Sequence, residues 1–399
     1  MSSSNDTTGM KRSAEEASLH DNESSGKDFQ RQPFSDPVAL PMNLIIGSIL
    51  PFVQDRSTWN NLCIANKELR DIGRTMTPPW PETTLQHRGF AMTTAFSPCG
   101  HFLACGTVRA SGGRPSLINI LDRQNGYETS LRGHIEDIFC LAFSDDGKYL
   151  ASGGNDRLIR IWPTNSAGKP TQQSCDNSLA GHPNEKVQCL AFASDSNLLV
   201  SASQFEIKIW NVEDCKCIQS FDQQHGSTSS LVFSGVGESI KCFAATTNGS
   251  LICISRNSSH DFEFTSDLIV DGETNFVNTA FSHCGSFLAT MDVTNKLCLY
   301  EVKTEGISLI QSVTLPAYCI LKTNAGMAFS ADNKTLSVIS DSSGEDDTVV
   351  RLLDMKDLLL QRQLKWHLRG EVNVSLAVDP TSRYLATACI DGRVRLRTI

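Results

Sequence analysis

Short apolar runs alternate with turn-forming residues in the second quarter of the chain. Ile138–Phe143 is almost continuously apolar, which is typical of a strand buried on both faces. Ser144–Gly147 has the composition of a tight turn, and Tyr149–Ser152 predicts a second strand that ends at Gly153–Asp156. Leu158–Trp162, rich in β-branched and aromatic residues, predicts a third strand. Such a sheet cannot bury its own faces, so we expect neighbours of the same kind.

A similar phrase, a small apolar residue and then phenylalanine before turn residues, recurs through the chain. Its second residue returns after 47, 49, 41, 48, 48 and 49 residues. Repeats of this period are typical of propellers, in which each four-stranded blade packs face to face on the next. Seven units therefore predict an all-β, seven-bladed β-propeller. The second residues are Phe96, Phe143, Phe192, Phe233, Phe281, Phe329 and Val378.

Two units carry a further pair of motifs. Gly133-His134 with Ile161-Trp162, and Gly181-His182 with Ile209-Trp210, resemble the Gly-His and Trp-Asp signatures of WD-repeat (WD40) propellers. The resemblance covers residues 82–399. It implies a WD40-type seven-bladed propeller over this range.

The same resemblance implies a buried hydrogen-bond relay of His, Ser, Asp and Trp within a blade, and one unit matches all four positions. The next unit keeps the histidine, serine and tryptophan but has Gln204-Phe205-Glu206 where the aspartate is expected. We expect the relay to be structural. Its residues are His134, Ser152, Asp156 and Trp162.

The two ends of the propeller segment are expected to meet. The last unit has only three strands, ending at Arg393–Arg397, and a blade of three strands leaves an unpaired edge. Thr83–His87, just before the first unit, can supply the fourth strand. This pairing would hold the ring closed.

Composition narrows the classes of function. The chain has 399 residues with 35 Lys+Arg against 44 Asp+Glu, a net charge of -9, so we expect no nucleic-acid partner. No apolar run is long enough to span a bilayer and no cleavable signal precedes the folded segment, which predicts an intracellular protein, cytoplasmic and/or nuclear, with no membrane partner.

Cysteine placement favours buried reduced thiols. Cys215 and Cys217 have no partnering His/Cys set, so no metal and no cofactor are predicted. Most of the 14 cysteines fall at strand positions, where cysteine behaves as a small apolar residue. These include Cys105, Cys140, Cys189, Cys242, Cys298 and Cys389.

The first 81 residues divide into three parts. Residues 1–36 are rich in Ser, Asn and acidic residues and are predicted to be a disordered tail. Residues 37–74 predict three short helices, with Pro41 in the first turn and Asp55 and Asn66 as caps. Residues 75–81, TMTPPWP, are a stiff Pro-rich linker.

The helical segment 37–74 resembles an F-box, the module that binds the small adaptor subunit of cullin-RING ubiquitin ligases. Asn43 and Leu69 depart from the family pattern, where an acidic residue and tryptophan are common. The alternative is a helical cap that packs its apolar stripe on the propeller. The residues that the resemblance assigns to adaptor binding are Leu40, Pro41, Leu44, Ile49, Leu50, Phe52 and Leu62.

Binding is favoured over catalysis. No GxSxG motif, phosphate loop or metal-ligand cluster is present, and the relay accounts for His134. The loops that join strands b–c and d–a of a propeller open on one face, where recognition residues sit on a rigid scaffold. Basic residues expected there can pair with an acidic or phosphorylated peptide, or each can be a solvated loop charge. They are Arg109, Arg114, Arg157, Lys186, Lys322, Arg369 and Arg393.

Together these features predict a protein that binds other proteins and is not an enzyme. The hypothesis is a substrate receptor of an SCF-type (cullin-RING) ubiquitin ligase, in which the propeller binds the substrate and the F-box-like helices bind the adaptor. The alternative is a WD-repeat scaffold of another assembly with no ubiquitin role. A propeller enzyme is the third, weakest reading.

Overall fold

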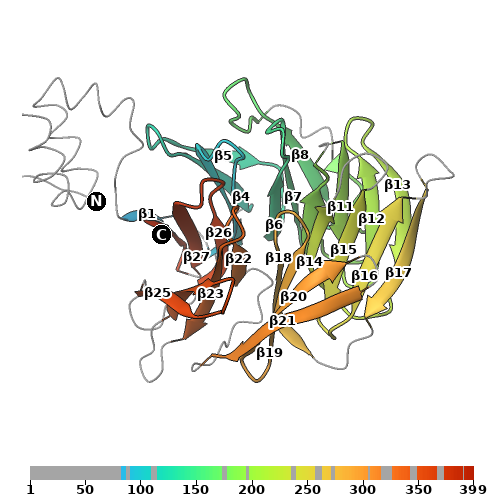
Figure 1. Cartoon of the computed structure of the whole chain (residues 1–399). Coiled ribbons are helices and arrows are strands. Elements are labelled where there is room, and N and C mark those ends of the chain that lie inside the picture. Colours follow the sequence, from blue (N-terminus) through green and yellow to red (C-terminus); the bar gives the residue numbers. More distant parts are fainter. Residues whose placement is uncertain are drawn as a thin grey trace, which may run out of the picture.

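The computed structural model describes residues 82–86, 90–108, 115–172, 178–194, 197–234, 240–256, 263–270, 275–303, 306–315, 326–341, 348–365, 373–389 and 391–399. All regular structure in these ranges is β-strand, arranged as seven four-stranded antiparallel sheets (Figure 1). The predicted tail 1–36, helical segment 37–74 and linker 75–81 lie outside the described residues.

Each sheet forms one blade, and the first three blades follow in chain order. Blade 1 contains β2 (Phe90–Phe96), β3 (Phe102–Val108), β4 (Leu117–Asp122) and β5 (Glu128–Arg132). Blade 2 contains β6 (Ile138–Phe143), β7 (Tyr149–Gly154), β8 (Ile159–Pro163) and β9 (Ser178–Leu179). Blade 3 contains β10 (Cys189–Phe192), β11 (Leu198–Ala202), β12 (Glu206–Asn211) and β13 (Lys216–Asp222).

The remaining blades repeat the pattern. Blade 4 contains β14 (Thr228–Ser234), β15 (Lys241–Thr246), β16 (Leu251–Arg256) and β17 (Phe264–Val270). Blade 5 contains β18 (Phe276–Phe281), β19 (Phe287–Asp292), β20 (Lys296–Lys303) and β21 (Gly306–Thr314). Blade 6 contains β22 (Met327–Phe329), β23 (Thr335–Asp341), β24 (Thr348–Asp354) and β25 (Leu360–Lys365). Blade 7 contains β26 (Asn373–Val378), β27 (Tyr384–Cys389), β28 (Arg393–Thr398) and β1 (Glu82–Gln86).

The blades form a closed ring. The first strand of each blade contacts the first strand of the next, from β2 through β6, β10, β14, β18 and β22 to β26, and β26 contacts β2 again. The strands of a blade are therefore called a to d from the axis outward. The seven-bladed propeller predicted from the repeat is confirmed.

The predicted closure is also observed, one residue earlier than expected. β1 pairs antiparallel with β28, with Glu82 opposite Arg397 and Gln86 opposite Arg393. It supplies the outer strand d of blade 7, so this blade has the same four strands as the others. Residues from the two ends of the described chain thus share one sheet.

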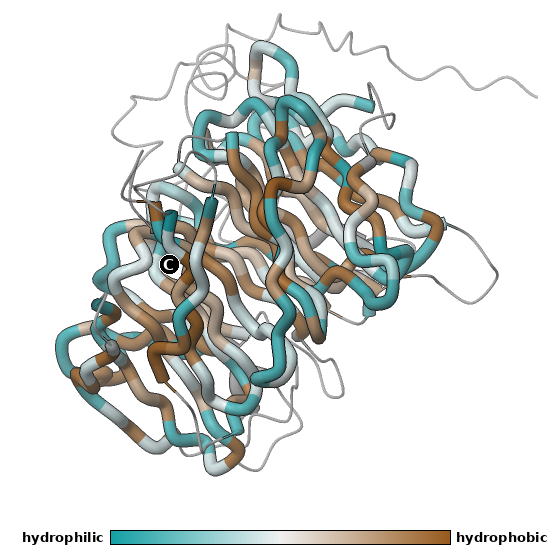
Figure 2. The backbone as a smooth tube through the Cα atoms, turned by 90° about the vertical axis from the view of Figure 1, so that its right-hand side faces the viewer, coloured by the Kyte–Doolittle hydropathy of each residue, from teal (hydrophilic) through white to brown (hydrophobic). Residues whose placement is uncertain are grey.

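The apolar core is divided into seven parts, one at each interface between neighbouring blades. Between blades 1 and 2, for example, Ile118 and Leu131 pack with Leu150 and Trp162. The corresponding cluster between blades 7 and 1 includes Val394 and Leu103, so the closing interface is packed like the others. Figure 2 shows the same arrangement, with hydrophobic tracts along the strands and hydrophilic residues at many turns. Stability therefore depends on every blade keeping both of its neighbours.

One predicted boundary is wrong. Strand β7 was expected to end before Gly153, but it continues through Gly154. A Cβ at Gly153 would lie 2.6 Å from Cγ1 of Val187, and one at Gly154 would overlap the carbonyl oxygen of Asp137. These glycines let the neighbouring backbone and blade approach closely; they do not end the strand.

The cysteines fit the apolar core of the propeller. The six cysteines predicted at strand positions are all buried, as expected, and none of the six forms a disulfide. Among the described residues, no helix has the length and apolarity needed to cross a bilayer.

Candidate interaction surface

The two faces of the propeller differ in their connections. In every blade the b–c connections and the d–a connections to the next blade open on one face, called here the loop face. The a–b and c–d turns open on the opposite face, called the turn face. This division follows from the antiparallel order of the four strands in each sheet.

On the loop face of blade 2, the four predicted relay residues form one hydrogen-bonded chain. His134 Nδ1 lies 2.8 Å from Asp156 Oδ2, and His134 Nε2 lies 2.7 Å from Ser152 Oγ. Trp162 Nε1 donates to the same Ser152 Oγ at 2.8 Å. A histidine protonated at Nδ1 donates to the carboxylate and accepts from the serine hydroxyl. The chain ties the d–a loop to strands b and c.

The relay leaves His134 no free nitrogen for chemistry. Its ring is 1% exposed and both nitrogens are engaged, so it presents no base to a substrate. Burial raises the pKa of Asp156, but the hydrogen bond from His134 and the amides of Leu158 and Ile135 together hold that pKa below its usual value. The carboxylate therefore stays ionised and structural.

Blade 3 contains a second relay that sequence analysis did not complete. His182 Nε2 lies 2.8 Å from Ser201 Oγ, which also accepts from Trp210 Nε1 at 2.8 Å. Glu206 Oε2 lies 3.1 Å from His182 Nδ1 and takes the place of the expected aspartate. Lys208 Nζ, 3.1 Å from the same oxygen, adds a cation to the group.

The glutamate works here because the b–c turn of blade 3 is short. Ser203 N donates to the carbonyl of Glu206 across the turn, so Glu206 is the first residue of β12. Its side chain is longer than that of aspartate and reaches His182 from strand c. In blade 2, Asp156 reaches His134 from the b–c turn. A carboxylate at the start of strand c is the signal that could have found it.

Three of the predicted basic residues are described, and all lie on the loop face. Arg157 is exposed with φ of 65°, and its Nη1 donates to the carbonyl of Pro183 at 2.9 Å. The amine of Lys186 lies 5.1 Å from the ring centroid of Phe139. Arg393 lies in blade 7, with Nη1 3.4 Å from Asp391 Oδ2. Arg109, Arg114, Lys322 and Arg369 lie outside the described residues.

Two of these cations share one area, and the third lies apart. The loop that carries Lys186 packs on the turn that carries Arg157, because Val187 N donates to Gly154 O and His182 N to Arg157 O. The loop face also carries two exposed apolar side chains that were not predicted from the sequence. Ile135 is 64% exposed and Phe205 is 55% exposed. Cations beside exposed apolar groups are suited to binding a protein surface.

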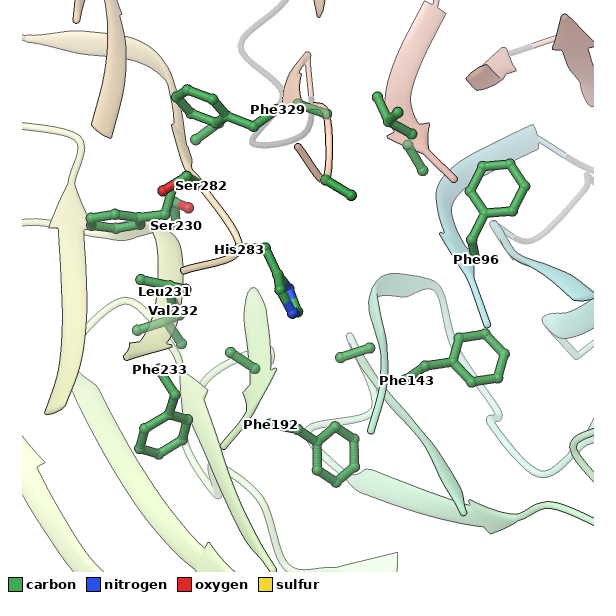
Figure 3. Close-up of a pocket in the computed structure, with 18 of the residues that line it drawn as sticks. Phe96, Phe143, Phe192, Ser230, Leu231, Val232, Phe233, Ser282, His283 and Phe329 are labelled. Carbon is green, nitrogen blue, oxygen red and sulfur yellow. The ribbon is translucent and has the colours of Figure 1, made fainter. Parts of the chain in front are cut away.

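A cavity of about 710 Å³ follows the propeller axis and is lined by residues from all seven blades (Figure 3). The rings of Phe96, Phe143, Phe233 and Phe329 turn away from its open centre, whereas His283 reaches into it. Among the residues that the structure describes, no group of three or more His, Cys, Asp and Glu is placed to hold a metal ion.

Comparison with known families agrees with this geometry. The model of the WD domain, G-beta repeat (WD40), matches residues 126–163, 173–211 and 359–397, which fall in blades 1–2, 2–3 and 6–7. The chain contains WD40 repeats, and its fold is a seven-bladed propeller. In the WD40 propeller the two complete relays lie within the first two matched segments, so the matched motif and the observed hydrogen bonds coincide.

Curated relatives share parts of the chain. A bromodomain and WD repeat-containing protein of Dictyostelium discoideum is 30% identical over 144 residues, covering 34% of this chain and 6% of the relative. Protein HIR1 of Yarrowia lipolytica is 25% identical over 42% of this chain and 18% of its own length. Striatin-3 of Mus musculus is 24% identical over 67% of this chain and 34% of its own. The WD40 propeller thus spans about a third or less of these relatives.

Proposed function

We propose that the WD40 propeller is a protein-interaction platform that binds a partner on its loop face, around Arg157 and Lys186. The observation that carries this proposal is the loop face at blades 2 and 3, which presents two neighbouring cations together with exposed apolar side chains. The relays fix the underlying loops, so this surface is rigid before the partner arrives and loses little conformational freedom on binding.

The finer proposal is that the protein is a substrate receptor of an SCF-type ubiquitin ligase. Its support is the F-box-like sequence of residues 37–74, which stands only seven residues before Glu82 of β1. Here the propeller would hold a substrate and the helical segment would hold the adaptor. The contribution is proximity, which brings a substrate lysine to the charged conjugating enzyme without an active site in this chain. Its place of action would be the cytoplasm, the nucleus or both.

Adaptor capture tests this finer proposal. The full chain, Leu50→Asp and the tail control Leu19→Asp are used to pull down the adaptor and cullin subunits, with circular dichroism to check the propeller. We expect capture by the full chain and by Leu19→Asp, and loss with Leu50→Asp. No capture by the full chain would rule out the ligase role and leave a scaffold of another assembly.

The scaffold alternative has its own support. The names of the three relatives above refer to bromodomain and WD repeats, HIR1 and striatin, and none refers to a ubiquitin ligase. In that case the loop face still binds a partner, and the segment 37–74 serves another contact. The two proposals therefore differ at the adaptor and agree on the loop face.

A further inference from the structure

The turn face carries a second polar feature, at the mouth of the axial cavity. In six blades the second residue of the a–b turn lines this mouth. Asp145 is the only carboxylate among the described residues that line the cavity, and none of those residues is lysine or arginine. The cavity wall is thus part polar and part apolar, and Asp145 is its single anionic group among the described residues. The six turn residues are Pro98, Asp145, Ser194, His283, Ala331 and Pro380.

Asp145 belongs to blade 2, and the imidazole beside it, that of His283, comes from blade 5 across the axis. Oδ2 of Asp145 lies 3.7 Å from Nε2 of His283, and the side chains are 36% and 74% exposed. Figure 3 shows His283 projecting into the open centre. A pair this long and this exposed is weak, because water screens it and the imidazole is free to turn away.

The groups around the Asp145 carboxylate only partly offset the cost of burying its negative charge. Burial raises the pKa of Asp145 and neighbouring Asp146 raises it further, although His283 and a hydrogen bond from Ser194 oppose the shift. A permanently charged cation placed at this mouth would therefore stabilise the ionised carboxylate.

We propose that the turn-face mouth of the axial cavity binds an ammonium or guanidinium group on an aliphatic stem, with Asp145 as its counter-ion. The head pairs with the carboxylate while His283 swings into solvent, and the stem extends along the cavity, whose wall is partly apolar. A cavity of about 710 Å³ is within the range of small-molecule sites. A partner's arginine or lysine side chain and a free alkyl amine share this chemistry.

This site is independent of the proposed function, because it opens on the face opposite Arg157 and Lys186. Isothermal titration of the full chain tests it with butylguanidinium and pentylammonium, against pentanoate and pentanol as anionic and neutral probes of similar size. We expect the two cations to bind and the other two probes to bind at least about tenfold more weakly, as expected for a charge-assisted contact. Equal binding of pentanoate would overturn the proposal.

Variants locate the site. Asp145→Asn removes the charge with little change of shape and should weaken cation binding about tenfold. Glu213→Gln removes an equal charge from an exposed position on the same face, in the c–d turn of blade 3, and should leave binding unchanged. His283→Ala should strengthen binding because it removes the competing group. Unchanged binding in Asp145→Asn, or an equal loss in Glu213→Gln, would contradict the assignment.

Two further arms complete the test. Ala331→Lys places a tethered ammonium at the same mouth and should block the added cation, with the fold verified by circular dichroism. Acetyl-Gly-Arg-Gly-amide then distinguishes the sources of the ligand. Tighter binding of this peptide than of butylguanidinium would identify a partner's arginine, and weaker binding would identify a small amine. Free binding of the cations to Ala331→Lys would overturn the proposal.

Discussion

The guanidinium of Arg123 in blade 1 lies over the ring of Tyr384 in blade 7, with its carbon 4.1 Å from the ring centroid. The same group lies 5.4 Å from the ring centroid of Phe96, donates to the carbonyl of Gly100 and is 3.8 Å from Asp379 Oδ2. The side chains of Arg123 and Asp379 are 8% and 1% exposed. This buried cation is therefore a second connection across the seam that β1 closes.

Replacing Arg123 by alanine should destabilise the propeller strongly. The change removes two aromatic contacts and the ion-pair contact with Asp379, whose carboxylate keeps its hydrogen bonds from Thr381 and two backbone amides, so the expected cost is about 1–3 kcal/mol of unfolding free energy. Arg123→Lys keeps a charge but loses the planar stacking group, so its stability should lie between those of the unsubstituted chain and Arg123→Ala. Urea denaturation measures both, with exposed Lys216→Ala as the control. An Arg123→Ala curve that coincides with this control would contradict the role.

Removing the closing strand should open the ring. Deletion of residues 1–88 takes away β1 and leaves β28 with an unpaired edge, whereas deletion of residues 1–81 keeps β1. We expect the shorter chain to melt at a clearly lower temperature than the 82–399 chain. Hydrogen exchange should also accelerate in β28 and β27. Equal melting temperatures in the two deletions would show that β1 does not hold the ring closed.

Removing the Ser152 hydroxyl from the relay of blade 2 should destabilise the propeller. Ser152→Ala removes the acceptor of Trp162 Nε1–H and the partner of His134 Nε2, and leaves both groups buried without it. The expected loss is about 1–3 kcal/mol of unfolding free energy. Ser201→Ala should cost a similar amount in blade 3, and exposed Ser266→Ala should cost little. A Ser152→Ala variant as stable as Ser266→Ala would mean that the hydrogen bonds are energetically neutral.

The second relay predicts a dependence on pH. Burial lowers the pKa of His182 to about 4, against an ordinary value near 6.5 in the unfolded chain. Between these values the unfolded state binds more protons, so the free energy of unfolding falls as the pH drops from about 6.5 toward 4, by at most about 1.4 kcal/mol per pH unit.

Denaturation curves between pH 5 and 7 isolate this effect. His182→Gln should flatten the pH dependence relative to the unsubstituted chain, and exposed His101→Gln should leave it as it was. If His182→Gln retained the full slope, other groups would be responsible for the acid sensitivity.

Much of the fold could be predicted from the sequence because a propeller repeats its local pattern. The phenylalanine of strand a recurs in six of the seven blades, so spacing alone gives the number of blades. The pairing of β1 with the last blade could be predicted because that blade has only three strands of its own. Gly153 and Gly154 were wrongly assigned to a turn. Glycine is also required where a strand packs closely against other residues, here Val187 and Asp137, and the sequence does not distinguish the two cases.

The contacts that cross blades could not be predicted. Arg123 and Tyr384 are separated by most of the propeller in sequence, and nothing near either residue indicates the other. Asp145 and His283 stand in ordinary turns, and only the ring closure places them on opposite sides of one cavity. Glu206 was missed for a local reason, because the short turn of blade 3 moves the carboxylate onto strand c.

The most direct test of the central claim is a quantitative comparison of proteins that co-purify with the full chain from cells. Arg157→Glu with Lys186→Glu reverses two charges on the loop face, and Lys148→Glu with Lys334→Glu reverses two exposed charges on the turn face. We expect at least one bound protein to be lost with the loop-face pair and retained with the turn-face pair. Retention of every bound protein by the loop-face pair would contradict the claim that this face binds the partner.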